Sequence, residues 1–156
     1  MIKTLIIALL IFCGANCFGQ TKQTSVPNYD AQLARKLGAD EYGMKTYVIA
    51  FLKAGPNKLK DSVARAELQR AHLKNIIRLA AEGKLIVAGP FLDDKEIRGI
   101  FIFDVPTIEE AIKLVETDPA VKVGTLKMEL HPWYGSAALV ETLEIHKKIQ
   151  QKSAAD

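Results

Sequence analysis

Two hydrophobic periodicities alternate along the chain from Lys45 onward. Short segments rich in Val, Ile, Phe and Tyr, bounded by glycine, proline or charged residues, are typical of strands. Between them, apolar residues recur every three or four positions, which predicts amphipathic helices. The expected elements are strand 46–53, helix 61–82, strand 84–88, strand 97–104, helix 107–118, strand 123–131 and helix 136–149.

Local signals support the ends of these elements. Gly83 follows the first long helix, and Pro119 prevents the second from continuing. Thr107 and Glu110 have the spacing of a capping box at the start of that second helix. A shorter helix is expected over 30–38, ended by Gly38. The order strand-helix-strand-strand-helix-strand predicts an α+β fold of the ferredoxin-like type, followed by a C-terminal helix.

Both faces of the predicted sheet are apolar. Over 47–52 and 100–103 successive residues are hydrophobic, whereas a half-exposed antiparallel sheet alternates apolar with polar residues. Two helices can cover only one face of such a sheet. We therefore expect a homodimer in which two sheets pack face to face, forming a dimeric α+β barrel.

The first residues have the pattern of a secretory signal. Lys3 precedes an apolar run over 5–13, which is shorter than the roughly 20 residues that a membrane-spanning helix needs. Small residues at Cys17 and Gly19 predict cleavage after residue 19, and hence an exported, periplasmic or secreted protein. A lipoprotein with Cys17 lipidated is the alternative. It fits less well, because Gly14 stands where such a signal has leucine and Asn16 is unusual directly before the cysteine.

Length and composition limit the number of folded domains. With 156 residues, 49% of them hydrophobic and 25% charged, the chain has room for one folded core. We expect a signal peptide over 1–19, a leader with the short helix over 20–44, the α+β domain over 45–134, and a C-terminal helix and tail over 135–156. The net charge is only +3, without a block of like charges, which disfavours a nucleic-acid partner. Both cysteines lie in the predicted signal, so the mature chain would have no disulfide and no thiol nucleophile.

The most informative polar residue is His72. On a helical projection it lies within an apolar stripe that includes Leu68 and Ile76, and Arg65 points the same way about two turns earlier. A buried imidazole needs hydrogen-bond partners, because an unpartnered polar group costs a few kcal/mol. Two interpretations remain open at this point: a core histidine whose hydrogen bonds are satisfied, or a general acid/base.

Asp118 is the candidate partner of His72. Both predicted helices lie on the same face of a ferredoxin-like sheet, so the two side chains can meet in a cleft. Asp118 could simply close its helix before Pro119. However, an acidic residue near a helix C-terminus is electrostatically unfavourable, which favours a specific role. A carboxylate that orients an imidazole is a common general-base pair.

The remaining candidates carry less specific signals. Arg65 or Arg70 would hold an anionic group of a substrate. Glu129 and His131 share one face of the last strand, but two potential ligands at this spacing are a weak metal signal, and we expect no metal. His131 and Trp133 are instead expected to line the mouth of the barrel. No phosphate-binding glycine loop, nucleophile elbow or dinucleotide fingerprint occurs, so no cofactor is expected.

At these residues the chain resembles the YCII-related (YciI-like) family. The matching motifs, within about 45–133, are Arg70-Ala71-His72-Leu73, Glu82-Gly83-Lys84-Leu85, Ala88-Gly89-Pro90, Asp118-Pro119 and Val123-Gly124. The resemblance implies a dimeric α+β barrel of ferredoxin-like protomers, with His72 and Asp118 as the proposed catalytic pair in a small cleft. Most members have no assigned substrate, and some relatives are implicated in dehydrochlorination of hydroxylated aromatic rings. The export signal, the leader and the extension over 131–136 depart from the short members and leave the substrate class open.

Three functional hypotheses follow. The leading one is a small cofactor-free enzyme of the lyase or isomerase type, in which His72 transfers a proton and Asp118 fixes its tautomer. Such chemistry suits one acid/base pair without a nucleophile or a metal. The alternative is a binding module that holds a small apolar or aromatic ligand without turnover. A third hypothesis is an interaction protein whose C-terminal helix docks a partner.

Overall fold

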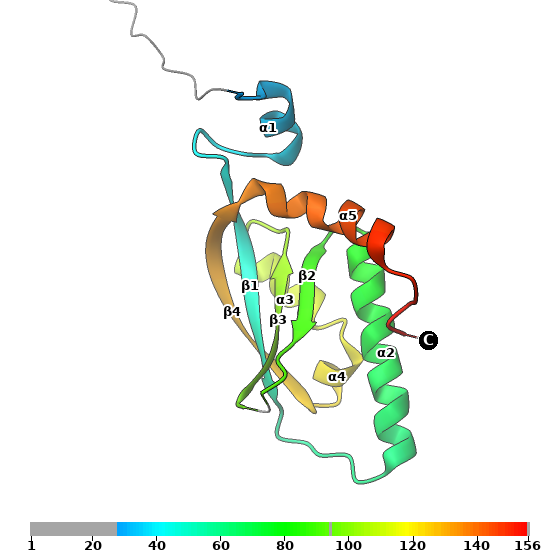
Figure 1. The fold of residues 1–156 in the computed structure, drawn as a ribbon. Coiled ribbons are helices and arrows are strands. Elements are labelled where there is room, and N and C mark those ends of the chain that lie inside the picture. Colours follow the sequence, from blue (N-terminus) through cyan, green and yellow to red (C-terminus); the bar gives the residue numbers. More distant parts are fainter. Residues whose placement is uncertain (1–27, 94, 156) are drawn as a thin grey trace, which may run out of the picture.

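The computed structural model describes residues 28–93 and 95–155. The predicted signal peptide and nearly all of the polar start of the leader lie outside these residues. The elements are α1 (Ala31–Leu37), β1 (Met44–Ala54), α2 (Ser62–Ala81), β2 (Leu85–Pro90), β3 (Ile97–Phe103), α3 (Ile108–Val115), α4 (Pro119–Lys122), β4 (Leu126–Ser136), the 3₁₀ helix η1 (Ala137–Glu141) and α5 (Thr142–Ile149) (Figure 1).

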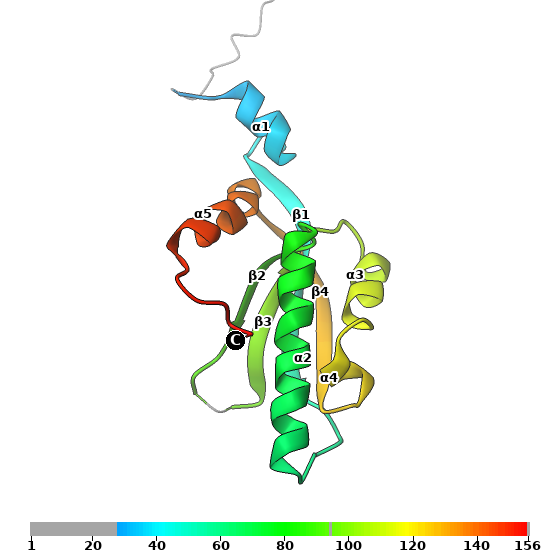
Figure 2. The ribbon, with the colours of Figure 1, turned by 90° about the vertical axis from the view of Figure 1, so that its right-hand side faces the viewer.

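The four strands form one antiparallel sheet in the order β2-β3-β1-β4. Helices α2, α3 and α4 lie together on one face of this sheet, with α2 running along its whole length (Figure 2). The α+β class and the ferredoxin-like arrangement are thereby confirmed. No helix in the described part of the chain combines the length and the hydropathy needed to cross a bilayer.

The main core lies between the sheet and its helices. Successive side chains of a strand point to opposite faces, so Val48, Ala50 and Leu52 of β1 all face the helices. They pack with Phe101 and Phe103 of β3 and with apolar residues of α2 and α3. Burial of this alternating set therefore fixes the register of the central strand, because a shift of one residue would expose the whole set.

The first long helix follows its sequence signals closely. Asp61 caps α2 by accepting a hydrogen bond from the Ala64 amide at 2.7 Å. At the other end, Gly83 adopts a φ of +68°, a left-handed conformation that glycine enters without steric cost. The expected range of 61–82 is therefore confirmed to within one residue at each end.

The expected helix over 107–118 is too long. Thr107 caps α3 as expected, but the helix ends at Val115, and the Thr117 hydroxyl lies 2.6 Å from the Leu114 carbonyl. Asp118 then adopts an extended conformation and caps the separate short helix α4, with Pro119 at its first position. Proline fits there because the first turn of a helix needs no amide donor from that residue.

The last strand begins later and ends later than expected. Gly124, with a φ of +72°, turns the chain after α4, so β4 starts at Leu126 rather than at Val123. It continues beyond His131 to Ser136, because the backbone stays paired with β1 as far as Met44. The expected helix over 136–149 is likewise divided into η1 and α5.

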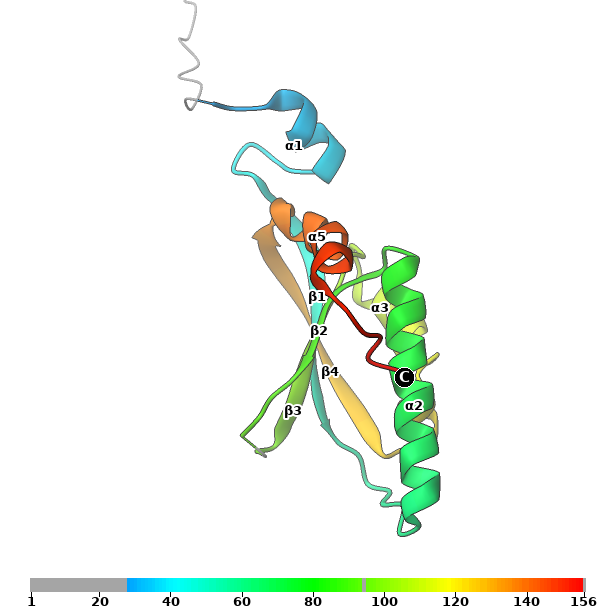
Figure 3. The ribbon, with the colours of Figure 1, turned by 45° about the vertical axis from the view of Figure 1, so that its right-hand side comes forward.

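The second face of the sheet is covered only in part. Leu139, Val140 and Leu143 of η1 and α5 pack over a small cluster formed by Tyr47, Ile86 and Ile102. Figure 3 shows this C-terminal segment at one end of the sheet, on a level with the top of α2. Farther along the same face, Ile49, Phe51 and Ile100 remain half-buried in the single chain. The C-terminal helix thus covers part of the face for which we expected a partner subunit.

The homodimer stays a prediction, and a substitution on this half-buried apolar face tests it directly. Phe51→Asp places a charge among Ile49 and Ile100, so we expect the light-scattering mass to fall from twice the chain mass to that of one chain. Ile77→Asp, at an exposed apolar position of α2, is the matched control and should leave the dimer intact. A wild-type protein that is monomeric at micromolar concentration would contradict the dimer.

Two tyrosine hydroxyls join segments that are far apart in the sequence. The fully buried Tyr47 donates a hydrogen bond to the Ser136 carbonyl at 3.0 Å, and burial together with Asp104 raises its pKa to about 12. The Tyr134 hydroxyl bonds to Asp40, and this carboxylate raises the pKa of Tyr134 to about 12. The same bond lowers the pKa of Asp40.

These raised pKa values predict alkaline sensitivity. In the unfolded chain the Tyr47 phenol ionises near its ordinary pKa of 10.0, whereas the folded chain holds the proton to about pH 12. The free energy of unfolding should therefore fall as the pH rises from about 10 to about 12. Tyrosinate absorbance should show a late step near pH 12 that shrinks in Tyr47→Phe and in Tyr134→Phe. A wild-type titration complete by pH 11 would contradict this.

Candidate active site

His72 lies on the side of α2 that faces the sheet, and it is 9% exposed. Its ring lies nearly parallel to that of Phe101 of β3, with an interplanar angle of 15° and centroids 6.1 Å apart. Because His72 belongs to the apolar stripe of α2, its imidazole lies against the sheet, with one ring face toward Phe101.

Asp118 meets this ring directly. Its Oδ2 lies 2.7 Å from His72 Nδ1, and its Oδ1 accepts a hydrogen bond from the Ala120 amide at 2.8 Å. The carboxyl group is almost completely buried, at 1% exposure. Both oxygens have partners, which offsets much of the cost of burying the carboxylate.

The electrostatic reason for expecting a special role at Asp118 is wrong. That reason placed the acid at the C-terminus of a helix, where the dipole is unfavourable. The structure places it at the N-cap of α4, where a carboxylate is favourable and common. What distinguishes Asp118 is instead that one oxygen caps α4 while the other binds an imidazole from a different helix.

The hydrogen bond to Asp118 gives the two ring nitrogens of His72 different roles. A carboxylate in its ionised form only accepts hydrogen bonds, and in that form Asp118 takes the proton of His72 Nδ1 as its donor. In the neutral ring the lone pair is then on Nε2, for which the described residues provide no hydrogen-bond partner. This geometry suits proton uptake at Nε2, with the Asp118 carboxylate stabilising the imidazolium that results.

A cleft of about 450 Å³ opens beside His72, between α2, the segment after β1 and the α4–β4 turn. Its polar lining consists of Asn57, Lys58, Arg65, Gln69, His72 and Thr125. Its apolar lining consists of Leu59, Leu68, Ala120 and Leu126. A cleft of this size, lined by both apolar and polar side chains, is of the kind that holds small organic molecules.

Backbone hydrogen bonds hold the rim of this cleft. Gly55 donates to the Thr125 carbonyl and Asn57 to the Gly124 carbonyl, both at 2.9 Å. The Asn57 side chain adds a bond of 2.8 Å to the Val123 carbonyl. A Cβ at Gly55 would lie 2.2 Å from the Gly124 carbonyl oxygen, so only glycine allows this approach. The wall is thus built by two segments far apart in the sequence.

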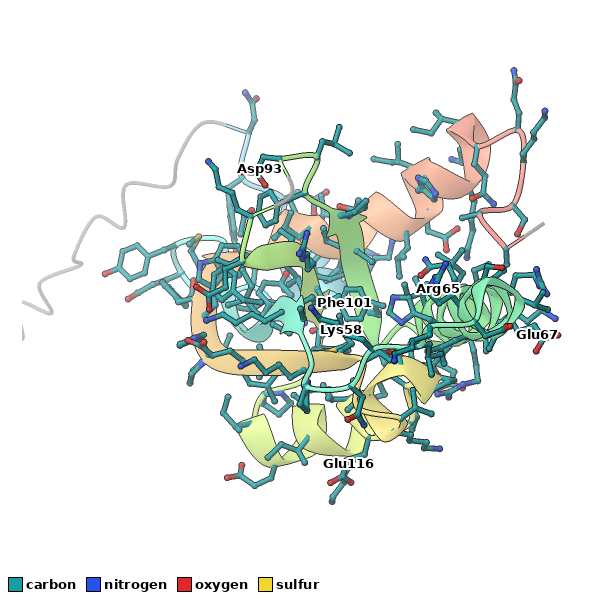
Figure 4. All side chains as sticks on the ribbon, turned by 90° about the horizontal axis from the view of Figure 1, so that it is seen from below. Lys58, Arg65, Glu67, Asp93, Phe101 and Glu116 are labelled. Atoms are coloured by element: carbon teal, nitrogen blue, oxygen red, sulfur yellow. The ribbon has the colours of Figure 1, made fainter. Side chains whose placement is uncertain are left out.

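Of the two candidate arginines, only Arg65 lines the cleft. Its Nη1 donates to the carbonyls of Leu59 and Lys60, at 3.0 and 2.6 Å. Viewed from below, Arg65 lies on the side of α2 turned toward the Lys58 loop, whereas Glu67 and Glu116 project outward (Figure 4). Arg70 is exposed and is not among the lining residues.

His131 and Trp133 lie on the other face of the sheet. His131 pairs with Ile49 in the ladder and makes an edge contact with the Phe51 ring, at 5.7 Å between centroids. Its Nε2 lies 2.9 Å from Glu129, which also pairs with Lys53. Trp133 packs against Tyr47. A single chain therefore does not bring either residue to the His72 cleft, and their role in substrate binding stays a prediction.

Metal coordination finds no support in the described residues. They contain no group of three or more His, Cys, Asp or Glu side chains placed to hold a metal ion. Glu129 and His131, the pair considered from the sequence, bond to one another, and Glu129 has a lowered pKa because Lys53 and His131 donate to it.

Sequence analysis missed a polar cluster beside Asp118. Asn75 follows His72 by about one turn of α2 and is also buried. Nη2 of Arg78 lies 2.8 Å from Asn75 Oδ1 and 2.9 Å from the Thr117 hydroxyl, so it joins α2 to the residue before Asp118. An asparagine on the same face of α2 as His72 was the available signal. This cluster helps to position the turn that carries Asp118.

The fold and the site define a ferredoxin-like α+β protein with a buried His–Asp pair beside a small cleft. A model of the YCII-related domain matches residues 46–134, more than half of the chain. The chain therefore belongs to the YCII-related family, and the resemblance found from its motifs is confirmed.

One solved structure with detectable similarity is 5-chloro-2-hydroxyhydroquinone dehydrochlorinase (TftG) from Burkholderia phenoliruptrix AC1100, in complex with 2,5-dihydroxybenzoquinone. The sequences are 29% identical over 57% of this chain and 93% of that chain, with a TM-score of 0.42. Among curated proteins, none matches the chain significantly.

Removal of the Asp118 carboxylate should destabilise the fold. Asp118→Ala deletes the cap of α4 and leaves His72 Nδ1 buried without an acceptor, so we expect a loss of about 2–4 kcal/mol in the free energy of unfolding. Asp118→Asn keeps a capping oxygen and should cost less. Asp61→Ala is the matched control, because it removes only a cap, worth about 1 kcal/mol. Equal losses in Asp118→Ala and Asp61→Ala, measured by urea unfolding, would show that the bond to His72 adds nothing.

Proposed function

We propose that this protein is an acid/base enzyme, acting without a cofactor on a small organic substrate, in which His72 transfers a proton and Asp118 positions it. The single observation that carries this proposal is the 2.7 Å contact between Nδ1 and Oδ2, beside a cleft that His72 lines. A core histidine that only satisfied its hydrogen bonds would not need to border a cavity of about 450 Å³.

The proposed chemistry is movement of one proton. His72 Nε2 takes a proton from an acidic carbon or hydroxyl group of the substrate and becomes an imidazolium. In an isomerisation it returns the proton to another atom of the substrate. In an elimination, the electron pair left behind expels a leaving group, and the imidazolium later gives its proton to solvent or to that group. A positioned acid/base group of this kind contributes about 10²–10⁴-fold in rate.

Asp118 supports this step in two ways. Its bond to Nδ1 selects the tautomer that has a free lone pair at Nε2, and its negative charge stabilises the imidazolium. An amide at this position would instead be able to donate to Nδ1. The ring would then carry its proton on Nε2 and would no longer act as a base.

A binding module without turnover is the second candidate. The observation that favours it is the apolar part of the lining, which includes Leu59, Leu68 and Leu126 and is suited to an apolar or aromatic ligand. In that case the His72–Asp118 bond would serve to fix α2 against α4, and the imidazole would contribute only a hydrogen bond to the ligand.

We also propose that the protein is exported and that it works as a homodimer. Support for export comes from the basic residue, short apolar run and small residues over 1–19. Support for the homodimer comes from the half-buried apolar residues Ile49, Phe51 and Ile100 on the second sheet face.

The experiment compares turnover and ligand binding in matched histidine variants. A panel of hydroxyaromatic and lactone substrates is screened with the wild-type protein, with His72→Ala and with Asp118→Asn. We expect at least a 100-fold loss of kcat/KM in His72→Ala and a clear loss in Asp118→Asn. His146→Gln, which changes an exposed histidine of α5, is the control and should keep full activity.

Two outcomes would decide against the enzyme. Unchanged turnover in a folded His72→Ala would remove the histidine from the reaction. No turnover with any substrate, together with a ligand that raises the melting temperature equally in the wild type and in His72→Ala, would establish the binding module instead. Retained dimer mass and circular dichroism in each variant show that the fold is intact.

A further inference from the structure

We infer that the cleft beside His72 takes a small organic anion, whose carboxylate binds the Arg65 guanidinium while its apolar body lies toward His72. This inference deepens the proposed function and rests on it for the identity of the site. It concerns the class of the substrate and selects Arg65, rather than Arg70, as the residue that recognises it.

The Arg65 side chain is held in place, yet most of its hydrogen-bonding capacity is unused. Only Nη1 has partners, the carbonyls of Leu59 and Lys60. Nε and Nη2 have none among the described residues, and together they form one edge of the planar guanidinium. That edge matches the two oxygens of a carboxylate, which arginine binds through parallel hydrogen bonds.

The charge around the cleft favours an anion. Its lining contains two cationic side chains, Arg65 and Lys58, and no aspartate or glutamate among the described residues. The nearest acid along α2 on the N-terminal side, Asp61, is occupied in capping the helix, and Glu67 projects away from the cleft (Figure 4). The Asp118 carboxylate is buried and bonded on both oxygens. A neutral ligand would leave this positive charge without a partner.

The dimensions of the cleft limit the anion to a small one. Arg65 and His72 lie about two turns apart on α2, roughly 10 Å along the axis. Leu68 lies between them on the same helix and Leu126 also lines the cleft, so apolar side chains, together with the polar Gln69, line the space between the two groups. A carboxylate attached to a single ring would place its charge at Arg65 and a ring atom near His72.

The test uses benzoate and its neutral analogue benzamide with the full-length chain. Backbone amide chemical shifts, followed as each compound is added, give both the affinity and the location of binding. In the wild type we expect benzoate to bind at least tenfold more tightly than benzamide, with shifts at Leu68 and Thr125. Raising the salt concentration should weaken the binding of benzoate and leave that of benzamide unchanged.

Three variants then locate the anion site. Arg65→Gln should raise the Kd of benzoate about tenfold and abolish the preference over benzamide, because a charge-assisted pair is lost. Arg65→Lys keeps the charge but not the planar edge, and should give an intermediate affinity. Lys74→Gln, which removes a positive charge from the solvent-exposed side of the same helix, is the matched control and should change the Kd less than twofold.

The outcomes separate this inference from the proposed function. Equal affinities for benzoate and benzamide in the wild type, or no effect of Arg65→Gln in a folded protein, would overturn the anion site even if His72 proves catalytic. If Arg65→Gln fails to fold, the salt dependence and Arg65→Lys still decide the matter. Conversely, selective benzoate binding that survives in His72→Ala would support the anion site even if no turnover is ever found.

Discussion

The hydrogen bond between the His72 ring and the Asp118 carboxylate joins parts of the chain that no local interaction brings together. At 2.7 Å and almost fully buried, it connects the middle of α2 to the turn between α3 and α4. Each partner depends on the other, because a buried imidazole or a buried carboxylate alone would carry an unpaired polar group. Asp118 also contributes to the cleft wall, because it caps α4 and α4 supplies Ala120 to the lining.

The two faces of the sheet serve different purposes. On the helix face, Val48, Ala50 and Leu52 are buried by α2 and α3, which gives His72 a rigid support through Phe101. On the other face, η1 and α5 cover one end only. The His72–Asp118 pair therefore lies on the helix face, while the half-buried apolar residues Ile49, Phe51 and Ile100 lie on the opposite side of the sheet.

The proposed proton transfer and the proposed charge recognition fall to different residues of one helix. His72 is buried and fixed by a carboxylate, whereas Arg65 is solvent-exposed and held by two loop carbonyls. Because α2 is a single rigid element, it sets the spacing between them. The opposite wall comes from loops whose backbone bonds, Gly55 to Thr125 and Asn57 to Gly124, hold the rim together.

The sequence by itself determined the order and class of the main elements and the limits of α2. It also singled out His72 as a candidate functional residue. These features could be predicted because periodicity, capping residues and glycine stops act over a few residues. Whether Asp118 ended one helix or began another was decided by tertiary structure, as was the extension of β4 to Ser136. The polar cluster of Asn75, Arg78 and Thr117 and the choice between Arg65 and Arg70 were also decided by tertiary packing. The fold expected from the sequence allowed His72 and Asp118 to meet, and the packing set their contact at 2.7 Å. Such contacts depend on how distant segments pack, and side-chain spacing along the chain does not fix their geometry.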